Sequence, residues 1–209
     1  IVATSELYRR TLASENGVIA PDAFQRINEK KQEANIKFLI NQANIRKSEL
    51  KNNSVKEFIE MLKKINADRE GLNIQNVEIQ AYASPEGGVK FNDKLAGQRK
   101  NQSEKYVKNT LKKTKVNADL DAHYTAQDWE GFQELVQNSD IEDKDLILRV
   151  LSMYSDPAVR ESEIKNMSSI YTELKSDVLP ELRRARFIAN VEFKNYTAEE
   201  LMDMVESNS

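Results

Sequence analysis

An arginine on the buried side of a predicted helix is the residue of this chain best suited to chemistry. Residues 77–100, VEIQAYASPEGGVKFNDKLAGQRK, have the pattern of a strand, a Pro-Glu-Gly-Gly turn and a helix. Residues three or four apart lie on one side of a helix, so Phe91, Leu95 and Arg99 should share the side that faces the core. Because an unpaired buried guanidinium is costly, Arg99 must reach solvent, pair with a carboxylate or bind an anion from another molecule.

Two roles for Arg99 remain open from these residues. The first is structural, an internal ion pair with Glu78 or Glu86. The second is an anion receptor that suits a carboxylate ligand. In that case the Gly87-Gly88 turn lets a ligand approach the backbone, and the start of the helix offers free N–H groups at the positive end of its dipole.

Alternating and helical patterns predict the elements that position this turn. Alternation of apolar and polar residues indicates strands, and spacing of three or four indicates helices. The expected order, β-α-β-α-β-α-α-α-β, predicts an α/β (α+β) two-layer sandwich with about four strands in a mixed sheet and helices on one face. Strands are expected within residues 35–45, 76–83, 118–126 and 182–194, with Ile36, Phe38 and Ile40 of the first strand pointing inward. Helices are expected within residues 52–65, 91–111, 127–137, 143–154 and 156–174. A further helix is expected over residues 21–35.

Composition excludes several classes of function. The net charge of -3 gives no sign of a nucleic-acid binder. The absence of cysteine excludes disulfides, thiol catalysis and zinc–thiolate sites. His123 is the one histidine, so no metal site with several histidines exists, and no phosphate-binding or nucleophile-elbow motif is present. We therefore predict no enzyme, no cofactor and no metal, although two carboxylates of a glycan- or peptide-cleaving enzyme need no sequence signature.

The segment AYASPEGGVKFNDKLAGQRK, residues 81–100, resembles the OmpA-like peptidoglycan-binding domain family. That family has a strand ending in Gly-His/Tyr-Thr-Asp, a loop glycine and then Asn-x-x-Leu-Ser-x-x-Arg-Ala. The matching positions here are Gly87, Asn92, Leu95 and Arg99, with Ala96 at the usual serine. LRRARFIANVEF, residues 182–193, is similar to the closing strand of the family. The resemblance covers residues 35–194 and includes a helical insertion at about 139–180. Residues 1–34 would form an N-terminal extension and residues 195–209 a C-terminal extension.

The resemblance implies a role for each residue of the site. In the family, the counterpart of Arg99 clamps the carboxylate of a diaminopimelate residue in the peptide stem of the cell wall, and the motif aspartate accepts the ammonium group. Ser84 stands at that aspartate position, and Glu86, two residues on, is a candidate to replace its charge. Arg183 and Arg184 match arginines that line the family's pocket, although they could also be exposed charges at a strand end. The implied ligand-binding set is Ser84, Glu86, Gly87, Asn92, Arg99, Arg183 and Arg184.

The resemblance also implies a place and a partner. It predicts a periplasmic module of a Gram-negative envelope that tethers an outer-membrane-associated protein to peptidoglycan. The alternative is an interaction module on the same fold that has lost peptidoglycan binding and contacts another envelope protein through its inserted helices. The first residue is not methionine, so we expect a longer precursor, whose other parts would supply any membrane association.

Overall fold

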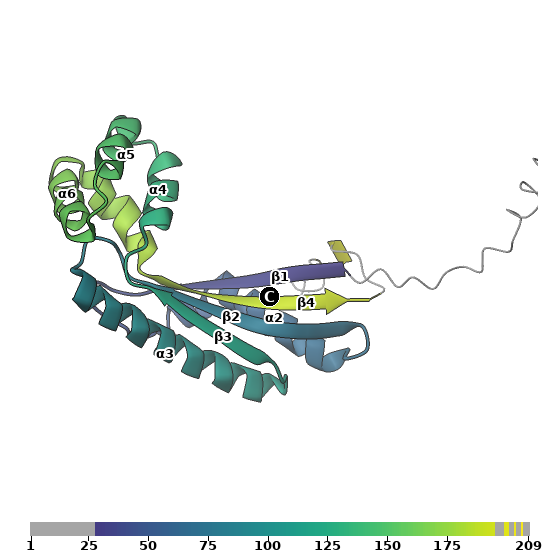
Figure 1. Ribbon diagram of the computed structural model, residues 1–209. Coiled ribbons are helices and arrows are strands. Elements are labelled where there is room, and N and C mark those ends of the chain that lie inside the picture. Colours follow the sequence, from purple (N-terminus) through teal and green to yellow (C-terminus); the bar gives the residue numbers. More distant parts are fainter. Residues whose placement is uncertain (1–27, 195–198, 201–202, 204–205, 207–209) are drawn as a thin grey trace, which may run out of the picture.

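A four-stranded mixed sheet forms the centre of the protein (Figure 1). The computed structural model describes residues 28–194, 199–200, 203 and 206. The strand order is β1-β4-β2-β3. Strand β4 runs antiparallel to both of its neighbours, while β2 and β3 are parallel. The strands are β1 Asn28–Lys37, β2 Leu72–Tyr82, β3 Asp119–Thr125 and β4 Arg184–Phe193. The predicted four-stranded mixed sheet is therefore confirmed.

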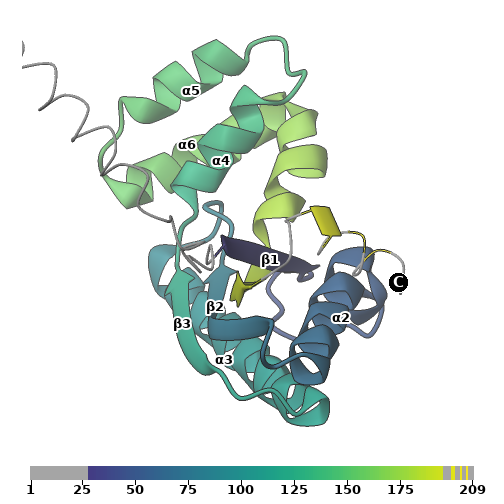
Figure 2. The same cartoon turned by 90° about the vertical axis from the view of Figure 1, so that its right-hand side faces the viewer.

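Two long helices cover one face of this sheet and enclose the main core (Figure 2). They are α2, Asn53–Ala67, and α3, Val89–Thr114. Strand β4 turns Phe187 toward them, and the Phe187 ring lies 6.1 Å from the ring of Phe58 and 5.8 Å from that of Tyr106. Alternate residues of β4 face the other way, as the period of two requires, and all of them are polar except Ile188, which is buried. The inward residues of β4 are Ala185, Phe187, Ala189, Val191 and Phe193.

Strand β1 differs from the prediction in its bounds. It begins at Asn28, inside the expected N-terminal extension, and ends at Lys37. The expected helix over 21–35 is thus wrong for residues 28–35, and residues 21–27 lie outside the described part of the chain. The expected inward phase holds for Ile36 and for Phe38 just beyond the strand, whereas Ile40 is 56% exposed. Pairing along the whole of β4 draws the polar residues at the start of β1 into the sheet. They are tolerated there because an edge strand keeps one face in water.

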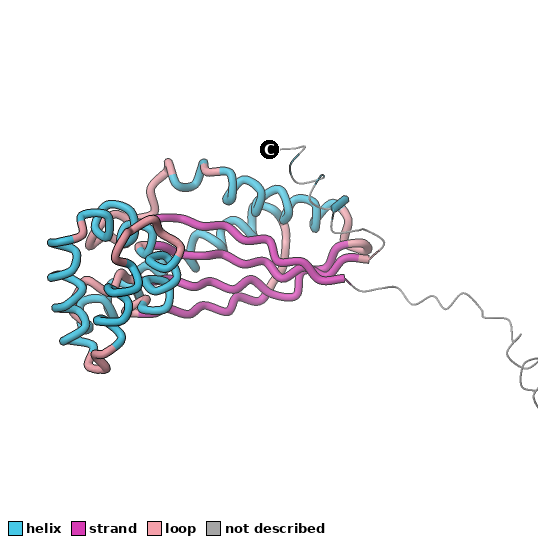
Figure 3. The backbone as a smooth tube through the Cα atoms, turned by 90° about the horizontal axis from the view of Figure 1, so that it is seen from above, coloured by secondary structure: helices cyan, strands magenta, loops and turns pink. Residues whose placement is uncertain are grey.

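The remaining helices gather at one end of the sheet (Figure 3). They are α4, Trp129–Gln137, α5, Lys144–Ser152, and α6, Pro157–Ile170, followed by the short turns η2, Leu174–Val178, and η3, Leu179–Leu182. We call residues 129–182 the helical segment. It has a hydrophobic core of its own, to which α4 contributes Phe132 and Val136. Helix α4, which precedes the insertion expected at about 139–180, packs with the helices that follow it. No helix in the described part of the chain combines the length and apolarity needed to cross a membrane.

Prediction for the core. Replacing Phe187 with alanine should lower the free energy of unfolding by about 3–5 kcal/mol, because it leaves a cavity between the sheet and both long helices. Phe91 is the matched control, since it was expected inward but is 49% exposed. Phe91→Ala should change stability by less than about 1 kcal/mol. Urea denaturation followed by circular dichroism measures both, and equal losses would contradict this description of the core.

Candidate functional site

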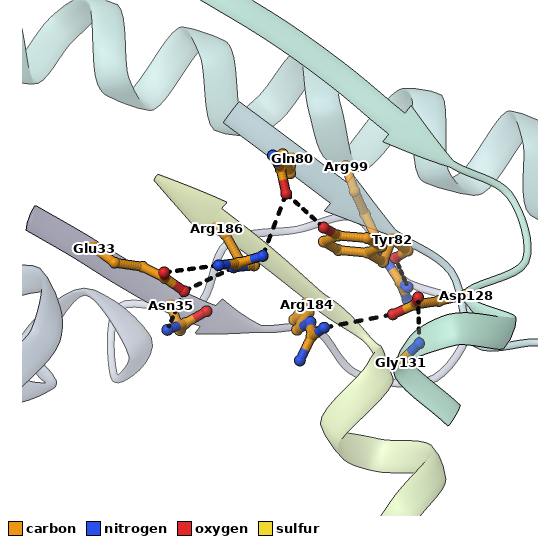
Figure 4. Close-up of polar contacts among 9 residues, drawn as sticks. All are labelled: Glu33, Asn35, Gln80, Tyr82, Arg99, Asp128, Gly131, Arg184 and Arg186. Carbon is orange, nitrogen blue, oxygen red and sulfur yellow. Dashed lines mark hydrogen bonds and ion pairs between the residues drawn. The ribbon is translucent and has the colours of Figure 1, made fainter. Parts of the chain in front are cut away.

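Arg99 lies on the buried face of α3, as predicted, and is 1% exposed. Its guanidinium donates to three main-chain carbonyls. Nε bonds the oxygen of Gln42 at 2.9 Å, one terminal nitrogen bonds that of Tyr82 at 2.9 Å, and the other bonds that of Leu39 at 3.2 Å. Figure 4 shows Arg99 beside Tyr82 at the end of β2.

No carboxylate of the described chain neutralises Arg99. The expected internal ion pair is not formed, because Glu86 bonds Arg183 at 2.7 Å and Glu78 accepts from Asn190 at 3.3 Å. Burial, with a smaller contribution from the nearby Arg183 charge, lowers the pKa of Arg99 to about 10. The side chain thus stays charged at neutral pH. Three of its five N–H groups bond carbonyls, and carbonyl dipoles leave its net charge in place.

A loop after β1 brings two of those carbonyls to the guanidinium. Between Leu39 and Gln42 the chain turns at Asn41, whose φ of 58° lies in the left-handed region. Asparagine tolerates this conformation better than most residues. Phe38, at the start of the loop, places its ring centre 5.0 Å from the guanidinium carbon, a favourable cation–π contact.

The Pro-Glu-Gly-Gly turn is held by Asn92 from the first turn of α3. The Asn92 side-chain amide donates to the carbonyls of Ser84 and Gly87, at 2.8 and 2.9 Å. A Cβ on Gly87 would lie 2.3 Å from the Asn92 side-chain oxygen, so any other residue would displace the side chain that holds the turn. In this structure Gly87 and Asn92 shape the turn.

A cavity of about 230 Å³ lies beside the turn and Arg99. The hydroxyl of Ser84, a residue only 6% exposed, is buried on its wall with no hydrogen-bond partner in the described chain. A buried polar group without a partner is uncommon and calls for an explanation, which a ligand would provide. The lining residues are Ile40, Asn41, Ser84, Glu86, Gly87, Asn92, Leu95, Arg99, Lys165 and Arg183.

Six of the seven residues expected in the site line this cavity, and Arg184 does not. Arg184 begins β4 on the polar face of the sheet, where its guanidinium lies over the Tyr82 ring and 3.6 Å from Asp128. Successive residues of a strand point to opposite faces, which separates Arg184 from its neighbour Arg183. Lys165, which α6 brings to the cavity from far along the chain, was not predicted as a site residue.

The polar face of the sheet carries a connected network (Figure 4). Arg186 bonds both oxygens of Glu33, at 2.7 and 2.8 Å, and one oxygen of Gln80 at 3.3 Å, and Gln80 accepts from the Tyr82 hydroxyl. These bonds raise the pKa of Arg186 and lower that of Glu33. Because these charges are paired with one another, this face has fewer unpaired groups available to bind a ligand than the cavity beside Ser84.

Two further features carry no comparable site. A larger hollow of about 870 Å³ between α3 and β3 is lined mainly by Lys, Asn and Glu side chains, and no unpartnered buried group lies in it. His123 is exposed and lies 2.8 Å from Asp121. Within the described residues, no three Asp, Glu or His side chains gather where they could hold a metal ion.

Comparison of the chain with protein-family models gives no match, and comparison with curated proteins gives no significant match.

Prediction for Arg99. Arg99→Met should lower the free energy of unfolding by about 3 kcal/mol, because it leaves three partly buried carbonyl oxygens without their charged donor. Arg183→Met, which breaks one partly exposed ion pair, should cost about 1 kcal/mol or less. Chemical denaturation of both variants measures the difference, and an Arg99 variant as stable as the wild type would show that the three carbonyls do not depend on it.

Prediction for Asp128. This residue caps α4 by accepting from the Gly131 N–H at 3.0 Å, and burial raises its pKa despite the opposing effects of that bond and of Arg184. The folded protein therefore takes up this proton more readily than the unfolded chain. The stability due to Asp128 is present at low pH and is lost as pH rises from the ordinary carboxyl pKa through the raised one. Asp128→Asn keeps a cap but should remove that decline.

Urea denaturation at a series of pH values from mildly acidic to neutral tests this expectation. Asp145→Asn, at an exposed position of the helical segment, is the control and should keep the wild-type profile. Glu33, whose lowered pKa acts in the opposite direction, is unchanged in all three proteins and cancels from the comparison. Parallel profiles for Asp128→Asn and the wild type would contradict the assignment.

Proposed function

We propose that this chain is a non-catalytic binding module that holds the free amino-acid end of a diaminopimelate residue in a peptidoglycan stem. The observation that carries the proposal is the uncompensated charge of Arg99 beside the unpartnered hydroxyl of Ser84 on one small cavity. A positive group and an unused hydroxyl on the same wall suit a carboxylate. The resemblance of residues 81–100 to the OmpA-like family supports the same ligand.

The cavity offers complementary groups to both charges of an amino-acid end. Its carboxylate would accept from the remaining N–H groups of Arg99, the Ser84 hydroxyl and Arg183. Its ammonium group would donate to Glu86, which lines the cavity and bonds Arg183. The volume of about 230 Å³ is below the usual range for drug-sized ligands and suits one end of an amino acid.

Serine at position 84 changes the strength expected of this binding. The aspartate that the resemblance places there would bond the ammonium group as an ion, whereas a hydroxyl brings no charge. Loss of one charge-assisted bond costs about 1.5–3 kcal/mol, or roughly one to two decades of affinity. Glu86 lies two residues on in the same cavity and compensates for part of this loss.

Such a module would work in the periplasm of a Gram-negative bacterium, joining an outer-membrane-associated protein to the cell wall. Recognition of the wall's peptide stem needs no bond to be made or broken, so the site residues only bind and orient. This location follows from the ligand and the resemblance together.

A second candidate function has one observation in its favour. The helical segment exposes the large apolar side chains of Leu146 on α5, Met153 just after it, and Val159 and Ile170 on α6, which suits contact with another envelope protein. Under this alternative the cavity beside Ser84 binds no stem peptide, so the titration below separates the two.

Prediction for the ligand. Titration with a synthetic stem peptide that contains diaminopimelate should shift the amide resonances from Ser84 to Arg99. The matched peptide has lysine in place of diaminopimelate and so lacks the carboxylate of the free amino-acid end. It should bind at least about tenfold more weakly. Glu86→Gln should weaken binding of the first peptide by a similar factor, because it removes the charge that faces the ammonium group.

Glu104→Gln, on α3 but outside this cavity, is the control and should bind like the wild type. Arg99 variants are unsuitable here because they also destabilise the fold. No shift with millimolar diaminopimelate peptide, in a protein shown to be folded, would reject the proposed function and favour the interaction module.

A further inference from the structure

The helical segment contributes a charged residue to the cavity, and the resemblance assigns no role to it. Lys165 of α6 lines the cavity together with Ser84 and Arg99. Its ammonium group pairs with Glu161 one helical turn earlier. The other oxygen of Glu161 lies near Gly88, 3.8 Å from where a Cβ on that glycine would be. Helix α6 thus lies close to the turn that forms the site.

The charges around the cavity do not balance for a zwitterionic ligand. Arg99, Arg183 and Lys165 line it as cations, and Glu86 is the one carboxylate among its lining residues. Counting Glu161, which pairs with Lys165, one positive charge remains in excess. An amino-acid end with one ammonium and one carboxylate leaves this excess unchanged, whereas a ligand with a further carboxylate neutralises it.

The two ends of the site differ in how accessible their charges are. Arg99 is fully buried, and Arg183 and Glu86 are partly buried against each other. The Lys165 side chain is 56% exposed. Lys165 is therefore the most exposed of the charged residues that line the cavity, within reach of the part of a longer ligand that stays outside after its amino-acid end has entered.

We infer that α6 completes the binding site, and that Lys165 binds a second carboxylate of the ligand, outside the amino-acid end held by Arg99 and Glu86. The preferred ligand is then a diaminopimelate peptide with net negative charge. The inference rests on the proposed function, because it describes another part of the same ligand. It also gives the inserted helices a role in specificity.

Three synthetic diaminopimelate peptides test this. The first has free carboxylates on the residue before diaminopimelate and at the peptide terminus, and each of the others has one of these amidated. Affinity is measured by calorimetry at low salt for the wild type, Lys165→Met and Lys165→Arg. Lys175→Met is the matched control, since Lys175 is an exposed lysine of the helical segment outside the cavity.

Lys165→Met should weaken binding of the fully charged peptide about threefold to fivefold, as expected for a half-exposed ion pair. Lys165→Arg should restore it, Lys175→Met should leave it unchanged, and added salt should reduce the difference. The peptide whose amidation removes the carboxylate bound by Lys165 should bind the wild type about threefold to fivefold more weakly than the fully charged peptide. Lys165→Met should not weaken its binding further. The position of that amide shows which carboxylate Lys165 binds.

The failures of the two proposals are distinguishable. Equal binding of all three peptides to the wild type and to Lys165→Met would overturn the inference while the proposed function stands. If no peptide binds the wild type, both are rejected. An equal loss of affinity in Lys165→Met and Lys175→Met would also overturn the inference, because it would reduce the effect to overall charge.

Discussion

The guanidinium of Arg99 joins three parts of the backbone that are far apart in the sequence. It belongs to α3 and bonds the carbonyl that ends β2 and two carbonyls of the loop after β1. The loop can present both carbonyls because Asn41 turns the chain between them. Arg99 thereby links the loop, the end of β2 and α3 beside the cavity, so we expect a change at this residue to affect the fold and the site together.

Carbonyl partners have a different consequence from carboxylate partners. A carboxylate would have satisfied the donors of Arg99 and cancelled its charge, leaving little attraction for an outside anion. Carbonyls satisfy donors through their dipoles and leave the positive charge uncancelled in a region of low dielectric constant, where it acts more strongly on a nearby anion than it would in water. Arg183 and Lys165 each have a carboxylate partner, so an incoming anion must compete for them.

The sequence was informative where a local pattern had one physical cause. Period-two alternation located β2, β3 and β4, and the spacing from Leu95 placed Arg99 on the buried face of α3. It failed for β1, because NEKKQEAN acquires its strand conformation from pairing with β4 and has few apolar residues of its own. The separation of Arg183 from Arg184 depends on where β4 begins, and a shift of one residue decides which face a side chain joins. Lys165 was beyond prediction, because no local signal links α6 to a turn that precedes it by almost eighty residues.

The strand order also has a consequence for how the chain folds during synthesis. Among the described residues, strand β1 pairs only with β4, and β4 lies between β1 and β2 although it is the last described strand along the sequence. The sheet therefore cannot close until the ribosome has delivered the helical segment, whose separate core is able to form earlier. Contacts between such distant residues slow folding, and until β4 inserts, β1 and β2 expose unpaired edges that favour aggregation. A nascent chain of this design needs protection until its final strand is complete.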